Sequence, residues 1–270
     1  LKKSDIFQFR APTGIGNYLI PYLSFFCDIP GWFKYGGNWI QKNPPLGYKF
    51  QRKFLKKYQN RKVTVNGKWD GSPAHIYSFE NPCLNEIDRK KGYKAILDKS
   101  YKKPWTLCFV GRLGEKKGEK IFLQAAKRYP MNSDIKKIHI IGDGKNKDEL
   151  LNISKDIDIN IEFHGFINKS KLSLLYSESN FIVLPSESEG FPKVIAEASN
   201  FGCIPIVSNV SSIPQYIKDD HNGFVWDKNK VLFESFFKKI LSKISSKEIR
   251  SLSINAHTFA EKFTFNHYIK

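Results

Sequence analysis

Two short segments hold charged residues where an apolar run gives way to a helical pattern. The first, residues 111–118, reads GRLGEKKG and carries Arg112 just after the apolar run and Lys117 just before the helix. Strand-to-helix junctions of parallel sheets face the ligand, so two cations there suit a diphosphate. They suit best the negative charge that develops as a diphosphate leaves. Taken alone, such a junction with a surface lysine is common and needs no ligand.

The second segment, residues 185–198 (PSESEGFPKVIAEA), carries two glutamates beside a predicted helix start. Pro192 suits the first helical position, which would leave free backbone amides at the carboxyl end of the sheet, where they favour phosphate. Glu189 lies in the turn and Glu197 on the helix. The turn carboxylate can accept two adjacent sugar hydroxyls, and the second can accept two ribose hydroxyls. Helix capping explains one of the two glutamates but not Glu189, which precedes the helix.

The elements that would position these residues alternate between strand and helix. Short β-branched and aromatic runs predict strands at residues 106–111, 137–142, 161–165, 181–185, 203–209 and 223–227. Apolar faces at residues 121–129 and 172–176 predict helices between them. This alternation predicts an α/β fold with a doubly wound parallel sheet, complete between about residues 104 and 250. Such sheets bind ligands at the carboxyl ends of their strands.

The first hundred residues are less regular. They predict strands in DIFQFRAP, GWFKYGG and KVTVNG and helices in GNYLIPYLSFF and residues 48–58, which together make a partial Rossmann-like domain over residues 1–100. The lysine-rich residues 90–104 are expected to link the two domains. Residues 251–270 are expected to form a C-terminal helix that returns toward the first domain.

The order of these motifs resembles a known family. PSESEGFPKVIAEASNFGCIPIV looks like the signature of retaining, family-4-type glycosyltransferases (glycosyl transferases group 1), which have the GT-B fold of two Rossmann-like domains. GRLGEKKG is similar to the phosphate-binding segment of that family. IIGDGKNKDEL and IEFHGFINKSKLSLLYSESNFIVLPS also follow the family's order and spacing. The resemblance covers about residues 105–227.

The resemblance implies a nucleoside-diphosphate sugar as the donor substrate, with no further cofactor and no bound metal. Arg112 and Lys117 would hold the diphosphate, Glu189 the hydroxyls of the transferred sugar, and Glu197 the ribose. The rest of the donor site would be Gly111, Gly165, Phe166, Gly190, Phe191 and Pro192. Transfer would retain the configuration of the sugar through front-face attack. Glu189 would then position the sugar without forming a covalent bond to it.

The match is poorer in residues 1–100. FQFRAPTGIGNYL and WFKYGGNW resemble the middle of the family's acceptor domain, with Arg10, Gly37 and Asn38 at strand ends that face the cleft. A solvated cation at a strand end is an equally good interpretation of Arg10. The early Gly-rich loop and first βαβ unit of that domain are absent, and the chain starts with Leu1, so we expect a truncated N-terminus.

A truncated acceptor domain has two expected consequences. The chain should bind nucleotide without appreciable sugar transfer, because the missing half would supply much of the geometry for attack. It should also be prone to association through the apolar residues of its first helix, Leu19, Tyr22, Phe25 and Phe26.

Composition limits the alternatives. The net charge of +18 suggests acidic partners, but most of the 44 basic residues are scattered lysines, which coding bias explains equally well. Because no nucleic-acid-binding motif is present, no nucleic-acid partner is expected. The four cysteines form no CxxC pair and the six histidines no HxxxH pair, so no metal site is expected. No apolar run approaches the roughly 20 residues that span a bilayer.

The sequence therefore predicts a cytosolic or membrane-peripheral enzyme that moves a sugar to a glycan or lipid-linked acceptor in cell-surface polysaccharide synthesis. The basic and aromatic helix at residues 48–58 either faces an anionic membrane surface or, as is commoner, packs on its own sheet. The alternative from another class is a non-catalytic module that binds sugar nucleotides.

Overall fold

The computed structural model describes residues 5–114, 116–129 and 134–269, and the chain divides into two compact units. The first unit comprises Leu1–Asn81 and Ser188–Phe191, and the second comprises Pro82–Glu187 and Pro192–Lys270. Each unit has its own parallel sheet, of four strands in the order β1-β2-β3-β4 and of six strands in the order β10-β9-β8-β5-β6-β7. The predicted α/β class is thus confirmed for both units.

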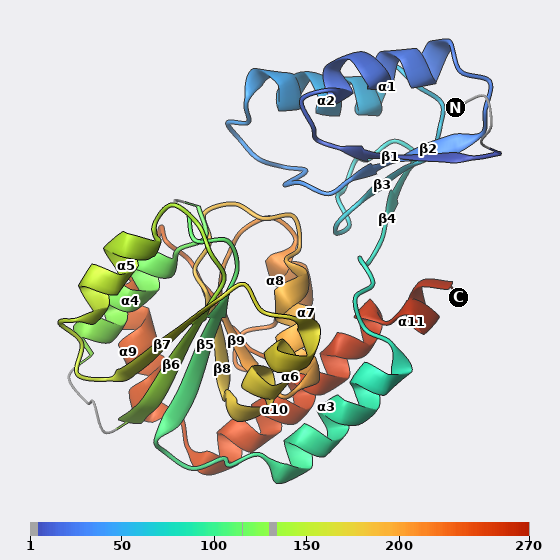
Figure 1. The fold of residues 1–270 in the computed structure, drawn as a ribbon. Coiled ribbons are helices and arrows are strands. Elements are labelled where there is room, and N and C mark those ends of the chain that lie inside the picture. Colours follow the sequence, from blue (N-terminus) through green and yellow to red (C-terminus); the bar gives the residue numbers. More distant parts are fainter. Residues whose placement is uncertain (1–4, 115, 130–133, 270) are drawn as a thin grey trace. The chain divides into compact units, whose positions relative to one another are not determined.

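The first unit follows the expected alternation and adds one short strand. Its elements are β1 (Phe7–Ala11), α1 (Gly16–Phe25), β2 (Gly31–Tyr35), α2 (Leu46–Lys57), β3 (Val63–Val65) and β4 (Ile76–Ser78). The two helices pack against each other on one face of the sheet (Figure 1). Large apolar side chains from both layers form the core, among them Ile20, Phe33, Leu55 and Val63, each 0% exposed.

The second unit contains the remaining elements. Its strands are β5 (Trp105–Val110), β6 (Ile135–Ile141), β7 (Asn160–Gly165), β8 (Phe181–Leu184), β9 (Ile204–Ser208) and β10 (Phe224–Trp226). Its helices are α3 (Glu86–Asp98), α4 (Glu119–Lys127), α5 (Lys147–Ser154), α6 (Lys169–Glu178), α7 (Lys193–Asn200), α8 (Ile213–Tyr216), α9 (Phe233–Lys243), α10 (Ser246–Ala260), η2 (Glu261–Phe263) and α11 (Phe265–Ile269).

The six-stranded sheet has helices on both faces. All residues of β5 and β8 are buried, as expected for inner strands of a parallel sheet covered on both sides. Figure 1 shows α4, α5 and α9 on one side of the sheet, and α3, α6, α7 and α10 on the other. This doubly wound arrangement puts the carboxyl ends of the strands, and the helix starts that follow them, at one edge of the unit.

Helix α3 occupies much of the segment that was expected to be a linker. Asn85 caps its start, accepting a hydrogen bond from the Asp88 amide, while the Asp88 carboxylate accepts one from the Asn85 amide. This capping box fixes the helix despite its many lysines. Helix α3 contacts α6, α7 and α10, so the division between the units falls at Asn81 and not near residue 100. The C-terminal helix α10 packs mainly on α7, within the second unit.

Helices α1 and α2 expose several of the side chains expected to pack or to associate. In α2, Phe54 and Leu55 are buried and pack with the sheet, but Phe50 and Tyr58 are about half exposed, and Gln51 is buried in their place. In α1, Leu19 packs against the core, whereas Tyr22 and Phe25, as well as Phe26 directly after the helix, are exposed. No described helix has the length and apolar composition needed to cross a membrane.

Candidate functional site

The loop between β5 and α4 carries both of the predicted diphosphate-binding cations. Arg112 is exposed, and no other described residue forms a hydrogen bond or ion pair with its guanidinium. Lys117 is half-buried close to the start of α4. Gly118 caps that helix with φ +82°, a left-handed conformation that favours glycine.

This loop is hydrogen-bonded directly to the turn that follows β8. The Glu187 amide donates to the Lys116 carbonyl at 3.0 Å, and the Ser186 hydroxyl donates to the Lys117 carbonyl at 3.2 Å. A Cβ atom on Gly118 would lie 2.2 Å from the Pro185 carbonyl oxygen, so only glycine permits this approach. Because β5 and β8 are neighbours in the sheet, the two predicted segments meet at its carboxyl end, as the sequence indicated.

The carboxyl ends of β6 and β7 lie beside that of β5 at the same edge of the sheet. The Gly111 amide donates to the Ile141 carbonyl at 3.0 Å, and the Gly142 amide donates to the Gly165 carbonyl at 2.9 Å. Gly165 has φ +60°, which turns the chain sharply after β7. Phe166 follows with its side chain 92% exposed, so the ring is accessible to a ligand at this edge.

Helix α7 starts at the predicted place, with one difference. Pro192 is the cap residue of the helix, with ψ 120°, and Lys193 is the first helical residue, so the proline does not occupy the first helical position. Its extended ψ keeps it outside the helix, and the free amides of the first turn begin one residue later. Lys193 is exposed there.

Glu197 lies within α7 and has no hydrogen-bonding partner or ion-pair partner among the described residues. Burial raises the pKa of its carboxyl group, an effect that Lys169 and Lys193 oppose and Asp88 reinforces. Lys169 itself donates a hydrogen bond to Asp88 at 2.6 Å. The arrangement leaves a half-buried carboxylate available to accept hydrogen bonds from a ligand.

The turn residues Ser188–Phe191, which include Glu189, are grouped with the first unit. Within that unit, a Cβ atom on Gly190 would lie 2.6 Å from the Gly36 carbonyl oxygen and 3.1 Å from that of Gly37. Gly190 is therefore required for close backbone packing. Phe191 is buried and Glu189 half-buried.

The three predicted acceptor-side residues lie at the carboxyl ends of two paired strands. Arg10 lies in β1, opposite Lys34 of β2, and its guanidinium lies near Gly36. Gly37 and Asn38 follow β2. The Asn38 side-chain oxygen accepts a hydrogen bond from the Ile40 amide at 3.1 Å, so it closes its own turn.

A match to a family model shows to which protein family the chain belongs. The model described as glycosyl transferases group 1 matches residues 94–257, more than half of the chain. The chain belongs to this family. The match includes both charged segments, all six strands of the second sheet and helix α7.

Curated relatives support the assignment to glycosyl transferases group 1. An uncharacterized glycosyltransferase of Haemophilus influenzae is 33% identical over 132 residues, which are 47% of this chain and 36% of the relative. An alpha-1,4-N-acetyl-D-galactosaminyltransferase of Campylobacter jejuni, whose acceptor is linked to diphosphate-undecaprenol, is 32% identical over 149 residues, or 54% of this chain and 39% of the relative. The chain thus spans less than half the length of these relatives.

Solved structures show that both units share the fold of the family. Anabaena Alr3699/HepE, crystallised with UDP-glucose, matches with a TM-score of 0.75 at 16% identity, over 97% of this chain and 76% of that protein. The GT-B class predicted from the sequence is thereby confirmed.

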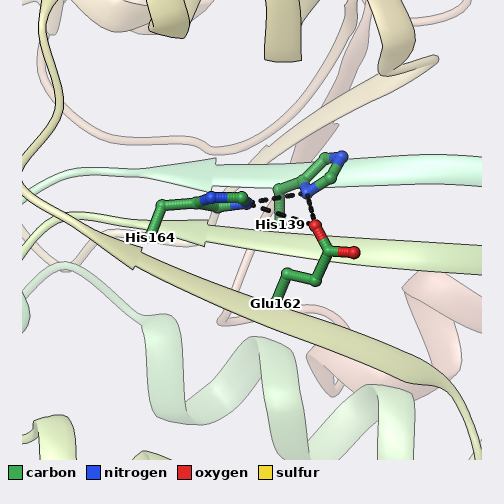
Figure 2. A group of neighbouring side chains, drawn as sticks. All are labelled: His139, Glu162 and His164. Carbon is green, nitrogen blue, oxygen red and sulfur yellow. Dashed lines mark hydrogen bonds and ion pairs between the residues drawn. The ribbon is translucent and has the colours of Figure 1, made fainter.

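In this member of the glycosyl transferases group 1 family, one group of neighbouring side chains was not predicted from the sequence. His139 of β6 lies beside Glu162 and His164 of β7, and Figure 2 shows the three side chains pointing toward one another. The alternation of Glu162 and His164 along one strand was a usable signal, because residues two apart on a strand share a face. The partner, His139, could be added only from the register of the two strands.

Proposed function

We propose that this chain binds a nucleoside-diphosphate sugar at the carboxyl end of its second sheet and takes part in transferring the sugar to a glycan or lipid-linked acceptor. One observation carries the proposal: the loop with Arg112 and Lys117 is hydrogen-bonded to the turn that leads into α7. Two cations thereby lie at the strand ends beside a turn and helix whose free amides favour phosphate. The doubly wound sheet of the second unit supports this edge as the ligand site, because such sheets bind ligands at the carboxyl ends of their strands.

Arg112 and Lys117 are proposed to bind the diphosphate. Charge-assisted hydrogen bonds from a guanidinium and an ammonium group stabilise phosphate oxygens, and do so more strongly as the bond to the sugar breaks. The accessible guanidinium of Arg112 supports this role, since no described residue already neutralises it. A metal ion is not needed for this task in the proposed mechanism, because the two cations perform it.

Glu197 is proposed to accept hydrogen bonds from the two ribose hydroxyls. Its carboxylate is half-buried without a described partner, and a ligand hydroxyl would compensate the cost of that burial. The exposed ring of Phe166, which directly follows Gly165 at the end of β7, is proposed to lie near the base, and Gly111 at the end of β5 is proposed to line the same edge.

The remaining roles complete the proposal. Glu189 would bind hydroxyls of the transferred sugar, with Gly190, Phe191 and Pro192 giving close backbone contact to the diphosphate. Arg10, Gly37 and Asn38 would face the acceptor. We propose retention of configuration with Glu189 as a positioning group. A lipid-linked acceptor is supported by the Campylobacter relative, whose name records one.

Calorimetry on Arg112→Ala, Lys117→Ala and the double variant tests the proposal, with UDP, GDP and ADP as ligands. Loss of each charged hydrogen bond should weaken binding of the preferred nucleotide by about 1.5–3 kcal/mol. Arg128→Ala is the matched control, because Arg128 is an exposed arginine at the other end of α4, paired with Glu234. Wild-type affinity in the double variant, or equal losses in the control, would refute the site.

A further inference from the structure

Three side chains with metal-binding atoms meet on one face of the second sheet. His139 lies directly opposite Glu162 in the register of β6 and β7, and His164 lies two residues beyond Glu162 on the same face (Figure 2). The strand β7 is at the edge of the sheet. Two histidines and one carboxylate are a common set of protein ligands for zinc.

The distances among the three facing atoms match one face of a zinc tetrahedron. His139 Nδ1 lies 3.0 Å from His164 Nε2 and 3.4 Å from a carboxylate oxygen of Glu162, and His164 Nε2 lies 3.6 Å from the same oxygen. With metal–ligand bonds of about 2.0–2.2 Å, the edges of a tetrahedron are about 3.3–3.5 Å. One ion could therefore contact all three atoms with small adjustments.

The contact between His139 and a further carboxylate outside the three ligands also suits a metal site. Without one, a hydrogen bond between the two imidazoles satisfies His139 Nδ1 but leaves the buried Nε2 atom with no hydrogen-bond partner among the described residues. When Nδ1 binds a metal, Nε2 carries the proton and the Glu178 carboxylate, 3.6 Å away, can accept a hydrogen bond from it after a small shift. A ligating histidine usually donates its second N–H group to a carboxylate in this way.

The group of three side chains is partly open to solvent, which leaves a route by which an ion could enter, and one neighbouring lysine adds positive charge beside it. The side chains of His164 and Glu162 are 12% and 38% exposed, so solvent reaches the group from one side. Lys137 pairs with the other oxygen of Glu162 at 2.7 Å, which orients the carboxylate but also opposes a cation.

We propose that His139, Glu162 and His164 form a Zn²⁺ site with three protein ligands, which ties the edge strand β7 to β6. Local CxxC and HxxxH spacings do not anticipate such a site, because its ligands come from two strands. Imidazole nitrogens select zinc and similar transition ions over Mg²⁺ or Ca²⁺, which prefer oxygen ligands. The site shares no residue with the proposed donor site, although His164 directly precedes Gly165, and the proposal does not depend on that site. Its expected effect is on the stability of the second unit.

Metal titration of the chelator-treated chain tests this site. Wild-type protein should bind one equivalent of Zn²⁺, and Co²⁺ should give the visible absorption of a site with a nitrogen and oxygen ligand set. His164→Ala and Glu162→Gln should each weaken Zn²⁺ binding more than about tenfold, and Glu178→Gln about tenfold. His221→Ala is the control, because His221 is an exposed histidine outside the group.

Thermal denaturation gives a second measurement that does not require catalysis. Zn²⁺ should raise the melting temperature of the wild type and of His221→Ala, but not that of Glu162→Gln, whose partly exposed position tolerates the amide without misfolding. Equal Zn²⁺ affinity in the wild type and Glu162→Gln, or no wild-type binding at micromolar Zn²⁺, would overturn the proposal. The His139 position is avoided, since His139 is fully buried.

Discussion

At the scale of single residues, Glu197 combines a cost to folding with a proposed use in binding. Burial raises the pKa of its carboxyl group, which means that ionisation is less favourable in the folded chain than in the unfolded chain. The folded state therefore loses stability as pH rises above the ordinary range of a glutamate, and the loss is absent below that range. Ligand-binding residues often carry such a cost.

We expect Glu197→Gln to stabilise the chain at pH 7.5 by on the order of 1 kcal/mol and to have no such effect near pH 4. The amide removes the buried charge while keeping the shape of the side chain. Chemical denaturation at both pH values measures the difference. A stabilisation that is the same at both values would show that the charge is not its cause.

The same variant should bind bare UDP or GDP more weakly, because the proposed contact is to ribose. Glu189→Gln serves as the comparison: it should spare the bare nucleotide and weaken only the nucleotide sugar. Calorimetry with both ligands separates the two glutamates. Equal losses of bare nucleotide affinity would contradict their assignment.

At the scale of elements, the proposed site depends on two loops that touch through their backbones. Gly118 has φ +82°, and a Cβ atom added to it would lie 2.2 Å from the Pro185 carbonyl oxygen. The absence of a side chain at this position therefore lets the loop after β5 pack against the turn after β8. Gly114, in the same loop, has no positive φ, and a Cβ atom added to it would meet no atom within 4 Å. The two glycines therefore form a matched pair.

Gly118→Ala should lower the free energy of unfolding by about 2 kcal/mol or more, since it adds a left-handed alanine and a backbone clash. Gly114→Ala should change it by less than about 1 kcal/mol. Urea denaturation measures both, and nucleotide titration should show weaker binding for Gly118→Ala alone. Similar destabilisation by the two substitutions would indicate that the approach to Pro185 is not what holds the loops.

At the scale of the whole molecule, the net charge of +18 comes from lysines distributed along the chain, and helix α2 gathers several of them. Four exposed lysines of this helix, Lys49, Lys53, Lys56 and Lys57, lie among the exposed apolar side chains of Leu46, Phe50 and Tyr58. Such a mixture suits the headgroup region of an anionic membrane.

Replacing these four lysines by glutamine should weaken binding to vesicles that contain anionic phospholipid on the order of 100-fold or more, because each lysine contributes about 1 kcal/mol at such a surface. Vesicle sedimentation at low and moderate salt measures the change. The control replaces four exposed lysines of the second unit, Lys228, Lys230, Lys238 and Lys239, and thus removes the same charge. Equal losses in both variants would mean that only net charge matters.

The alternation of strands and helices in the second unit, and the place of its charged loops, could be predicted from the order of the residues alone. Inner parallel strands such as β5 and β8 are buried on both faces, so they form continuous apolar runs that are visible without a structure. Parallel strands also place their carboxyl ends at one edge, which is why Arg112, Lys117 and Gly165 could be expected together.

In two helices the local sequence contains signals that composition obscures. The start of α3 is marked by the Asn85–Asp88 capping box, although its lysine-rich composition suggested a linker. In α2 the buried residues are Gln51, Phe54 and Leu55, so a polar glutamine takes a place on the buried face while the aromatic side chains of Phe50 and Tyr58 stay about half exposed.

Contacts across the sheet and between loops, in contrast, follow only from the packed fold. His139 meets Glu162 because of the register of β6 and β7, and Gly118 meets Pro185 because β5 and β8 are neighbours although β6 and β7 lie between them along the chain. A periodic pattern fixes which face a residue takes, but a shift of register changes its partners without changing that pattern. Contacts of this kind depend on packing over long sequence separations, and no local spacing encodes them.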